Sequence, residues 1–171
     1  GHGTGALFVE GVDDLHGATA AVISDPLEAG TFAIAAAMTG GDLTLQRTKA
    51  RTLDALLKVL RETGATVTET DATIRVVANG RPVAADITTD PFPGFPTDLQ
   101  AQFMAMMCIA NGSSRISETI FENRFMHVPE LLRMGADIKV DGGVAIVCGR
   151  KVLTPAPVMA TDLRASVSLV L

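Results

Sequence analysis

Three segments of the chain place ionisable side chains where the sequence predicts a helix to begin. They contain Asp25 with Glu28, Asp98 alone, and Asp162 with Arg164. Aspartate is a common N-cap and the helix dipole favours acidic groups at this end, so capping alone could account for the carboxylates. Arg164 is different, because a cation in a first turn faces the positive end of the helix and needs an anion nearby. Asp162 would serve, and so would a phosphate or carboxylate ligand held at the helix N-terminus.

A second group of reactive side chains lies in residues 117–128, SETIFENRFMHV, between a predicted strand and a predicted helix. Loops that a rigid scaffold holds in such places often bind ligands. A simpler interpretation is that Arg124 pairs with Glu118 or Glu122 on a solvated edge and that His127 only starts a helix. The residues alone leave both interpretations open. The sequence contains no Gly-rich phosphate loop, no G-x-S-x-G elbow and no Cys–His nucleophile pair.

Composition restricts the classes of function. The 171 residues carry 14 Lys and Arg against 19 Asp and Glu, a net charge of −5, and 47% of them are hydrophobic. Such a chain is expected to fold as one domain. Without a basic block, Trp or Tyr, nucleic acid is not an expected partner. The longest apolar runs, 32–38 and 103–110, are much shorter than the roughly 20 residues that cross a bilayer, so no membrane contact is expected.

Cysteine and histidine usage predicts neither a disulfide nor a metal site. Cys108 and Cys148 lie far apart in apolar segments, which is typical of buried thiols in a reducing compartment. The histidines, at positions 2, 16 and 127, lack the spacing of metal ligands. We therefore expect a cytoplasmic protein with no metal and no cofactor.

The elements that would position these residues recur along the chain with a period of about 70 residues. Residues 25–41 resemble 97–112, and in both the pattern is that of a capped helix ending at glycine. Residues 60–67 resemble 131–138, where a second helix leads through Gly-Ala into a strand. A third copy of the first helix begins at Asp162.

This repeat predicts an α/β fold. Hydrophobic patterns and turn signals place helices at 26–38, 51–63, 98–110 and 127–134, and strands at 43–46, 65–69, 73–77, 114–118, 137–140 and 144–148. The first helix of each repeat is apolar nearly all round. We expect those helices to be buried on every side, with the sheets outside them.

Several long strings resemble the UDP-N-acetylglucosamine 1-carboxyvinyltransferases, a family of enolpyruvyl transferases. The strings are FPTDLQAQF at 95–103, ETIFENRFMHVPEL at 118–131, RMGA at 133–136, VMATDLRAS at 158–166, VEGV at 9–12 and LEAGTF at 27–32. The resemblance implies two similar domains of repeated βαβαββ units, each an inside-out α/β barrel with inward-facing helices. It makes residues 1–171 a single incomplete domain, with units at about 18–88 and 89–156 and a truncated third unit at 157–171.

The resemblance also assigns roles in transferring the enolpyruvyl group of phosphoenolpyruvate to the 3-hydroxyl of UDP-N-acetylglucosamine. Asp98 would bind the sugar nucleotide and take the proton from its hydroxyl, and the backbone of Ile120 would touch the same substrate. Arg124 and Arg164 would neutralise the phosphoenolpyruvate side, with Asp162 as the acidic partner of Arg164. Such a reaction needs a base at the hydroxyl, an acid at the vinyl carbon and fixed cations for the phosphate and carboxylate.

The resemblance places the acid on a mobile loop of the other domain, and neither Cys108 nor Cys148 matches its motif. The chain alone is therefore expected to be inactive, with the other domain as its partner. Residues 163–171 should either fray or be covered by another copy of the chain. Two alternatives stay open: the sister enzyme acting on shikimate 3-phosphate, against which the string ENRFMH argues, and a non-catalytic binding module of the same fold.

Overall fold

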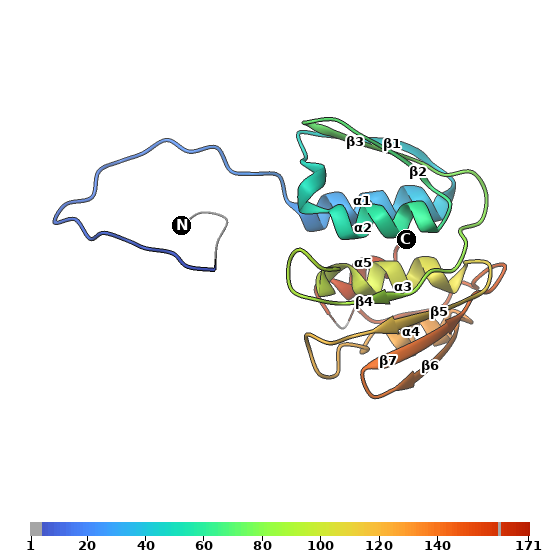
Figure 1. Ribbon diagram of the computed structural model, residues 1–171. Helices are drawn as coiled ribbons and strands as arrows, with labels where there is room; N and C mark the ends of the chain where they lie inside the picture. Colours follow the sequence, from blue (N-terminus) through green and yellow to red (C-terminus); the bar gives the residue numbers. More distant parts are fainter. Residues whose placement is uncertain (1–4, 161) are drawn as a thin grey trace.

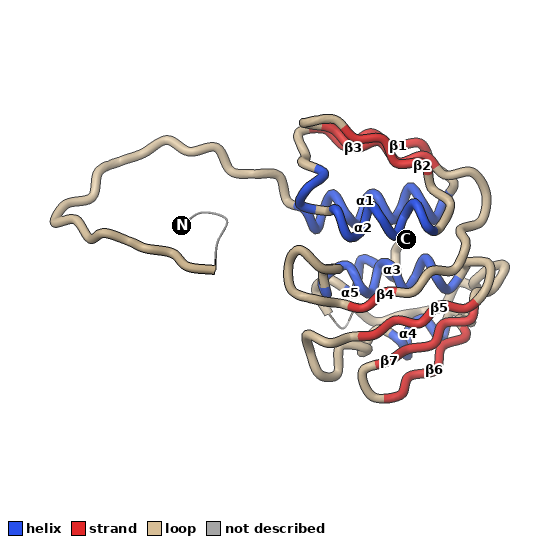
Figure 2. The backbone as a smooth tube through the Cα atoms, in the orientation of Figure 1, coloured by secondary structure: helices blue, strands red, loops and turns tan. Residues whose placement is uncertain are grey.

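A computed structural model describes residues 5–160 and 162–171 of the chain. His2 and Thr161, to which expectations were attached, lie outside these residues. Two β-sheets form the outer layers, and α1, α2, α3 and α5 lie between them (Figures 1 and 2). Residues 5–24 form an extended, exposed segment that leads away from these layers. The expected α/β class is confirmed, and four of the helices lie between the two sheets.

The first half of the chain forms a three-stranded antiparallel sheet covered by two helices. Asp25 caps α1, since its carboxylate accepts hydrogen bonds from the N–H groups of Leu27 and Glu28, and α1 ends at Gly40 with φ of 67°. The sheet order is β1-β3-β2. The elements are α1 (Pro26–Thr39), β1 (Asp42–Gln46), a 3-10 turn (Ala50–Thr52), α2 (Asp54–Glu62), β2 (Thr66–Glu69) and β3 (Thr73–Val77).

The second half repeats this order around a four-stranded sheet, β4-β5-β7-β6. The β4 strand runs parallel to β5, and the other pairs are antiparallel. The α4 helix contacts β6. The elements are β4 (Ile87–Thr88), a 3-10 turn (Thr97–Leu99), α3 (Gln100–Cys108), β5 (Ser113–Ser117), α4 (Val128–Arg133), β6 (Asp137–Asp141), β7 (Val144–Cys148) and α5 (Ala165–Ser168).

All the expected helices and strands form, but four helices are shorter than the sequence predicts, and the one expected at 127–134 spans Val128–Arg133. The helix expected at 51–63 begins at Asp54 after the 3-10 turn, and the helix expected at 98–110 begins at Gln100 and ends at Cys108. The third copy is a helix of only four residues, which packs on α3 and leaves Val170 exposed. The β4 strand was not expected, because two residues are too few to show an alternating pattern.

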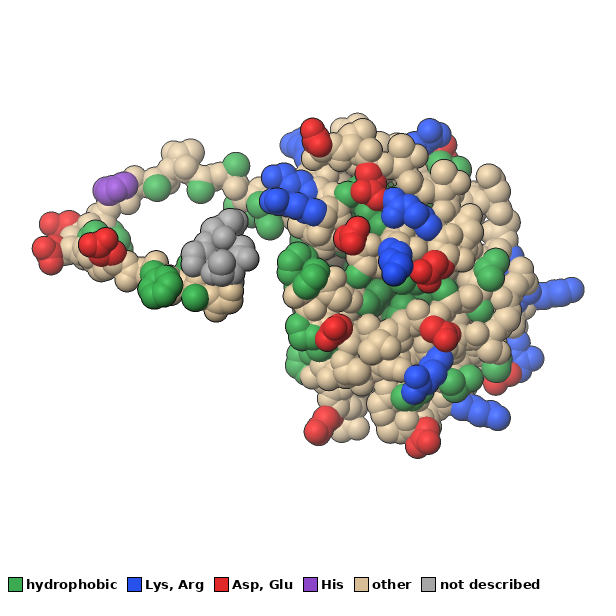
Figure 3. Space-filling view, in the orientation of Figure 1, with side chains coloured by type: hydrophobic (Ala, Val, Ile, Leu, Met, Phe, Trp, Pro, Cys, Tyr) green, Lys and Arg blue, Asp and Glu red, His purple; other side chains and the backbone are tan. Residues whose placement is uncertain are grey.

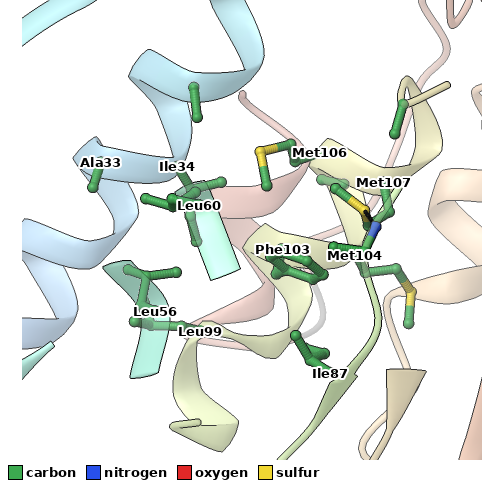
Figure 4. Close-up of a cluster of buried hydrophobic side chains, with 14 of the residues drawn as sticks. Ala33, Ile34, Leu56, Leu60, Ile87, Leu99, Phe103, Met104, Met106 and Met107 are labelled. Atoms are coloured by element: carbon green, nitrogen blue, oxygen red, sulfur yellow. Dashed lines mark hydrogen bonds between the residues drawn. The ribbon is translucent and has the colours of Figure 1, made fainter. Parts of the chain in front are cut away.

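The α3 helix forms the centre of the core. All nine of its residues are buried, and it contacts α1, α5, β5 and β7. Figure 4 shows Phe103 and Met106 of α3 beside Ile34 of α1 and Leu60 of α2. For α1 the expectation of burial on every side was wrong, because Phe32 is 51% exposed. The α1 helix contacts α2, α3, β1 and β3, and these neighbours leave one of its edges uncovered.

Charged groups and thiols are distributed as in many globular proteins. On the face in Figure 3, acidic and basic side chains are interspersed rather than separated by sign.

Cys108 is buried, which raises the pKa of its thiol to about 12, and both Cys108 and Cys148 are free. Among the described residues, no helix is long and apolar enough to cross a membrane.

The end of α3 packs tightly against the end of β7 at Gly149. The N–H of Arg150 donates to the Cys108 carbonyl at 2.7 Å, and the guanidinium of Arg81 donates to the carbonyls of Ile109 and Ala110, so the last carbonyls of α3 have partners. A Cβ on Gly149 would lie 1.9 Å from the carbonyl oxygen of Ala110. Only glycine fits at this contact between two backbones.

We therefore expect Gly149→Ala to lower the free energy of unfolding by about 1–3 kcal/mol or more, since 1–3 kcal/mol is typical of overpacked cores. Gly41→Ala is the matched control, because a Cβ there meets its nearest neighbours at an ordinary 3.5 Å. Urea unfolding of both variants measures the difference. Equal midpoints for Gly149→Ala and Gly41→Ala would show that the backbone contact at Gly149 is not a constraint.

Candidate active site

Four of the five expected site residues line one cavity of about 280 Å³. The cavity lies at the start of α3, between the loop that follows β5 and the residues that precede α5. Its lining includes Asp98, Arg124, Asp162 and Arg164. The fifth residue, Ile120, does not line this cavity but borders an adjoining hollow together with Thr97 and Asp98. The tertiary structure therefore brings together residues that are up to 66 positions apart in the sequence, from Asp98 to Arg164.

Asp98 and Arg124 form an ion pair in the lining of this cavity. The Nη2 atom of Arg124 donates to Oδ1 of Asp98 at 2.5 Å, and the guanidinium carbon lies 4.9 Å from the centre of the Phe121 ring. Both charged side chains are largely shielded from solvent, with 34% of Asp98 and 23% of Arg124 exposed. The carboxylate and the ring together fix the guanidinium from two directions.

This ion pair corrects two of the simpler interpretations of the sequence. Arg124 pairs with Asp98, not with Glu118 or Glu122, because the turn before α3 brings Asp98 to the loop after β5. Asp98 does not cap its helix either. The N-cap residue of α3 is Leu99, and no side chain caps this helix. The 3-10 turn at Thr97–Leu99 directs the carboxylate into the cavity instead.

Asp162, unlike Asp98, binds the backbone at the start of the helix that follows it, although the N-cap residue of α5 is Arg164. The Oδ1 atom of Asp162 accepts hydrogen bonds of 2.8 Å from the backbone N–H groups of both Arg164 and Ala165. These bonds, chiefly the one from Ala165, hold the pKa of Asp162 below its usual value, although partial burial opposes them. The guanidinium of Arg164, by contrast, makes no ion pair or hydrogen bond with any described residue. It is the one cation on the described lining that remains free to meet an anion.

His127 forms part of the lining as a neutral group. The residue is 1% exposed, and its Nε2 atom has no partner within the described structure. Burial lowers the pKa of His127 to about 4; the carboxylate of Asp162 opposes this shift and Arg124 adds to it. The Oε1 atom of Gln100, also on the lining, is likewise buried and unpartnered among the described residues. Two residues of the lining therefore each hold a buried, uncharged polar atom that has no partner among the described residues.

Sequence reasoning did not single out Glu118 as a site residue. Its side chain is buried beneath the loop that carries Arg124, and no described cation pairs with it. A carboxylate directly after a strand with alternating buried residues is a signal that could have identified it, because an acid at such a position needs several hydrogen-bond donors.

The chemistry open to this cavity is acid–base catalysis on an anionic ligand. Asp98 offers a carboxylate that can accept a proton, Arg124 a fixed positive charge, and Arg164 a free one. Among the described residues, no group of three or more His, Cys, Asp or Glu side chains could hold a metal ion.

Comparisons with known proteins show the family to which the chain is related. The chain is 61% identical over 174 residues to UDP-N-acetylglucosamine 1-carboxyvinyltransferase of Afipia carboxidovorans, and 59% identical over 172 residues to the enzyme of that name from Methylobacterium radiotolerans. Each alignment covers 100% of this chain and 40% of the relative, so the chain spans less than half the length of these proteins. The resemblance noted in the sequence is confirmed.

A solved structure supports the fold. The enolpyruvyl transferase NikO from Streptomyces tendae superposes with a TM-score of 0.72 at 24% sequence identity, over 87% of this chain and 36% of NikO. The family model for EPSP synthase (3-phosphoshikimate 1-carboxyvinyltransferase) matches residues 1–171. With its whole length matched by that model, the chain belongs to the EPSP synthase family.

Proposed function

We propose that this chain forms one wall of the active site of a UDP-N-acetylglucosamine 1-carboxyvinyltransferase. The enzyme would transfer enolpyruvyl from phosphoenolpyruvate to the 3-hydroxyl of UDP-N-acetylglucosamine and release phosphate, the first committed step of peptidoglycan synthesis. The observation that carries the proposal is the cavity in which Asp98 is paired with Arg124 while Arg164 has no ion-pair partner among the described residues. The 61% identity to an enzyme of that name supports it.

The reaction requires the O–H bond of the sugar to add across the carbon–carbon double bond of phosphoenolpyruvate. Asp98 accepts the hydroxyl proton as the oxygen attacks the carbon that carries the phosphate, and an acid delivers a proton to the methylene carbon. Loss of that phosphate and of one methyl proton then restores the double bond. We place the acid on the other domain, outside this chain.

The charges of the cavity suit these substrates. Arg124 is already held by Asp98 and by the ring of Phe121, so its guanidinium can face an incoming anion without first losing much side-chain freedom. Arg164 supplies a second cation for the phosphate or carboxylate of phosphoenolpyruvate. Asp162 fixes the backbone on which Arg164 stands, through the two N–H groups that it binds. The backbone of Ile120 borders the neighbouring hollow, where it would contact the sugar nucleotide.

We propose the finer architecture together with this function. The chain would be a single incomplete domain of an inside-out α/β barrel, with units at about 18–88 and 89–156 and the start of a third at 157–171. The second half, which runs β4-α3-β5-α4-β6-β7, supports a βαβαββ unit. The partners would be the two substrates and a second domain, and the reaction would take place in the cytoplasm.

The sister reaction on shikimate 3-phosphate is the second candidate, because the matching family model carries its name. The experiment that decides is phosphate release by the protein at the full length of its relatives, with phosphoenolpyruvate and either acceptor. We expect release with UDP-N-acetylglucosamine and none with shikimate 3-phosphate. Release with the second acceptor alone would overturn the proposal, and binding without release would favour a non-catalytic module.

Replacing the proposed base tests the role of Asp98. In the full-length protein we expect Asp98→Asn to lower kcat by about 10²–10⁴, the usual contribution of a general base, with a much smaller change in KM for the sugar nucleotide. Asparagine keeps the size of the side chain and can still accept a hydrogen bond from Arg124, but it cannot take the proton.

Asp25→Asn is the matched control for this substitution. Asp25 caps α1 and lies outside the cavity, and asparagine caps a helix as well as aspartate does. Steady-state kinetics and a thermal melt on both variants are required. A kcat for Asp98→Asn within about twofold of wild type, well below the range for a general base, would remove Asp98 from the chemistry.

The neutral state of His127 predicts an acid-sensitive fold. Because the pKa of His127 falls from 6.5 to about 4 on folding, the unfolded chain binds more protons between these values. Stability should therefore decrease as the pH falls from about 6.5 to about 4, by up to about 3 kcal/mol from this group. Urea unfolding at a series of pH values measures the slope.

His127→Gln should reduce that slope whatever it does to absolute stability, because the titrating group is gone. His16→Gln, at an exposed histidine, should leave the slope unchanged. If the slopes of wild type and His127→Gln are equal, acid sensitivity arises elsewhere in the molecule.

A further inference from the structure

Glu118 lies at the junction of the two loops that carry the ion pair of the cavity. It directly follows β5, and the residue is only 7% exposed. Its Oε1 atom accepts hydrogen bonds from the hydroxyl of Thr89 at 2.9 Å and from the backbone N–H groups of Ile120 at 2.9 Å and Phe121 at 3.2 Å. Two of these donors belong to the loop that leads to Arg124.

The second oxygen of Glu118 binds the opposite loop. Oε2 accepts a hydrogen bond from the hydroxyl of Thr97 at 2.9 Å, and a longer one from Nε2 of Gln100 at 3.5 Å. Thr97 is the residue before Asp98, and Gln100 is the second residue after it. One carboxylate therefore connects the segment that contains Asp98 to the segment that contains Ile120 and Phe121.

Packing alone does not call for an acid at this position. No described Lys, Arg or His side chain forms an ion pair with Glu118, and placing a lone charge in a buried site is unfavourable unless hydrogen bonds replace its lost solvation. The five donors around Glu118 provide that replacement. A carboxylate has the particular advantage that its two oxygens together can accept from donors on two different segments.

We propose that Glu118 is a positioning residue, which sets the separation between Asp98, Arg124 and the backbone of Ile120 by tying their two loops together. In the reaction proposed above, on which this inference rests, Asp98 must reach the sugar hydroxyl while Arg124 faces the other substrate. Misplacement of such groups by about 1 Å can lower a rate by about 10²-fold. Glu118 itself lies off the wall of the 280 Å³ cavity and acts through the residues it holds.

The link through Thr97 allows this role to be tested without deleting the buried acid. Thr97→Val replaces the hydroxyl that joins Oε2 to the segment of Asp98 with a methyl group, at nearly constant side-chain volume. In the full-length protein we expect kcat to fall at least about tenfold with a smaller change in KM. The reason is that a misplaced Asp98 impairs proton transfer more than it impairs substrate binding. Thr97→Ser, which restores the hydroxyl, should return kcat to within about threefold of wild type.

Thr63→Val is the matched control. The hydroxyl of Thr63 is also buried and makes one hydrogen bond, to the Leu60 carbonyl at 2.8 Å, but it lies at the end of α2. We expect this variant to lose stability to a degree similar to that of Thr97→Val and to keep the kcat of wild type. If Thr97→Val does not fold, Thr97→Ala removes the same hydroxyl without adding a methyl group and replaces it in the test.

A readout independent of activity separates this inference from the proposed function. In wild type, hydrogen exchange at the amides of Ile120 and Phe121 should be slow, since both donate to Glu118. Thr97→Val should accelerate it several-fold across the loop, and Thr63→Val should not. A wild-type protein without transferase activity but with this exchange pattern would refute the proposed function and retain the link.

Two results would overturn the positioning role of Glu118 while leaving the proposed function intact. A wild-type protein that is active, with Thr97→Val unchanged in both kcat and amide exchange, would overturn the positioning role of Glu118. A loss of kcat in Thr97→Val that Thr97→Ser does not restore would overturn it too, because the effect would then not depend on the hydroxyl that Glu118 binds.

Discussion

Burial of α3 is the constraint on which the rest of the structure depends. A helix with nine buried residues needs neighbours around its whole circumference, and here α1, α5, β5 and β7 provide them. The side chains of Phe103, Met104, Met106 and Met107 exclude water along the length of α3. The polar contacts of this helix therefore lie at its two ends. At the C-terminal end Arg81 and the N–H of Arg150 satisfy the carbonyls. At the other end the cavity opens, beside Asp98.

The start of α3 is also where local and tertiary preferences disagree. An aspartate before a helix ordinarily accepts hydrogen bonds from the first turn, as Asp25 and Asp162 do. Asp98 does not take that role but pairs with Arg124, and the helix begins two residues later than expected, without a side-chain cap. Local consistency is commonly broken where a residue serves a ligand, so this departure itself marks the site.

The cavity combines fixed charges with uncharged polar groups. Burial keeps His127 neutral, so the positive charge of the lining resides on Arg124 and Arg164 alone among the described residues. Arg124 is held by a carboxylate and a ring, and the guanidinium of Arg164 has no partner in the described part of the chain. Beneath them Glu118, satisfied by hydrogen bonds rather than by a cation, holds the two loops in register. Preorganised binding requires that the groups facing a ligand are held rigidly by the residues behind them, and the hydrogen bonds of Glu118 provide this support for the cavity lining.

The sequence by itself determined the order of the helices and strands except β4, the burial of α3 and four residues of one cavity, because these follow from hydrophobic periodicity, glycine signals and long family-specific strings. Which partners the charged groups take was decided only by the tertiary structure. Asp98 and Arg124 are separated by 26 positions, and nothing in their spacing tells whether the arginine meets Asp98, Glu118 or Glu122. That choice depends on how the turn before α3 and the loop after β5 pack on each other, a contact between segments distant in the chain that no local pattern encodes.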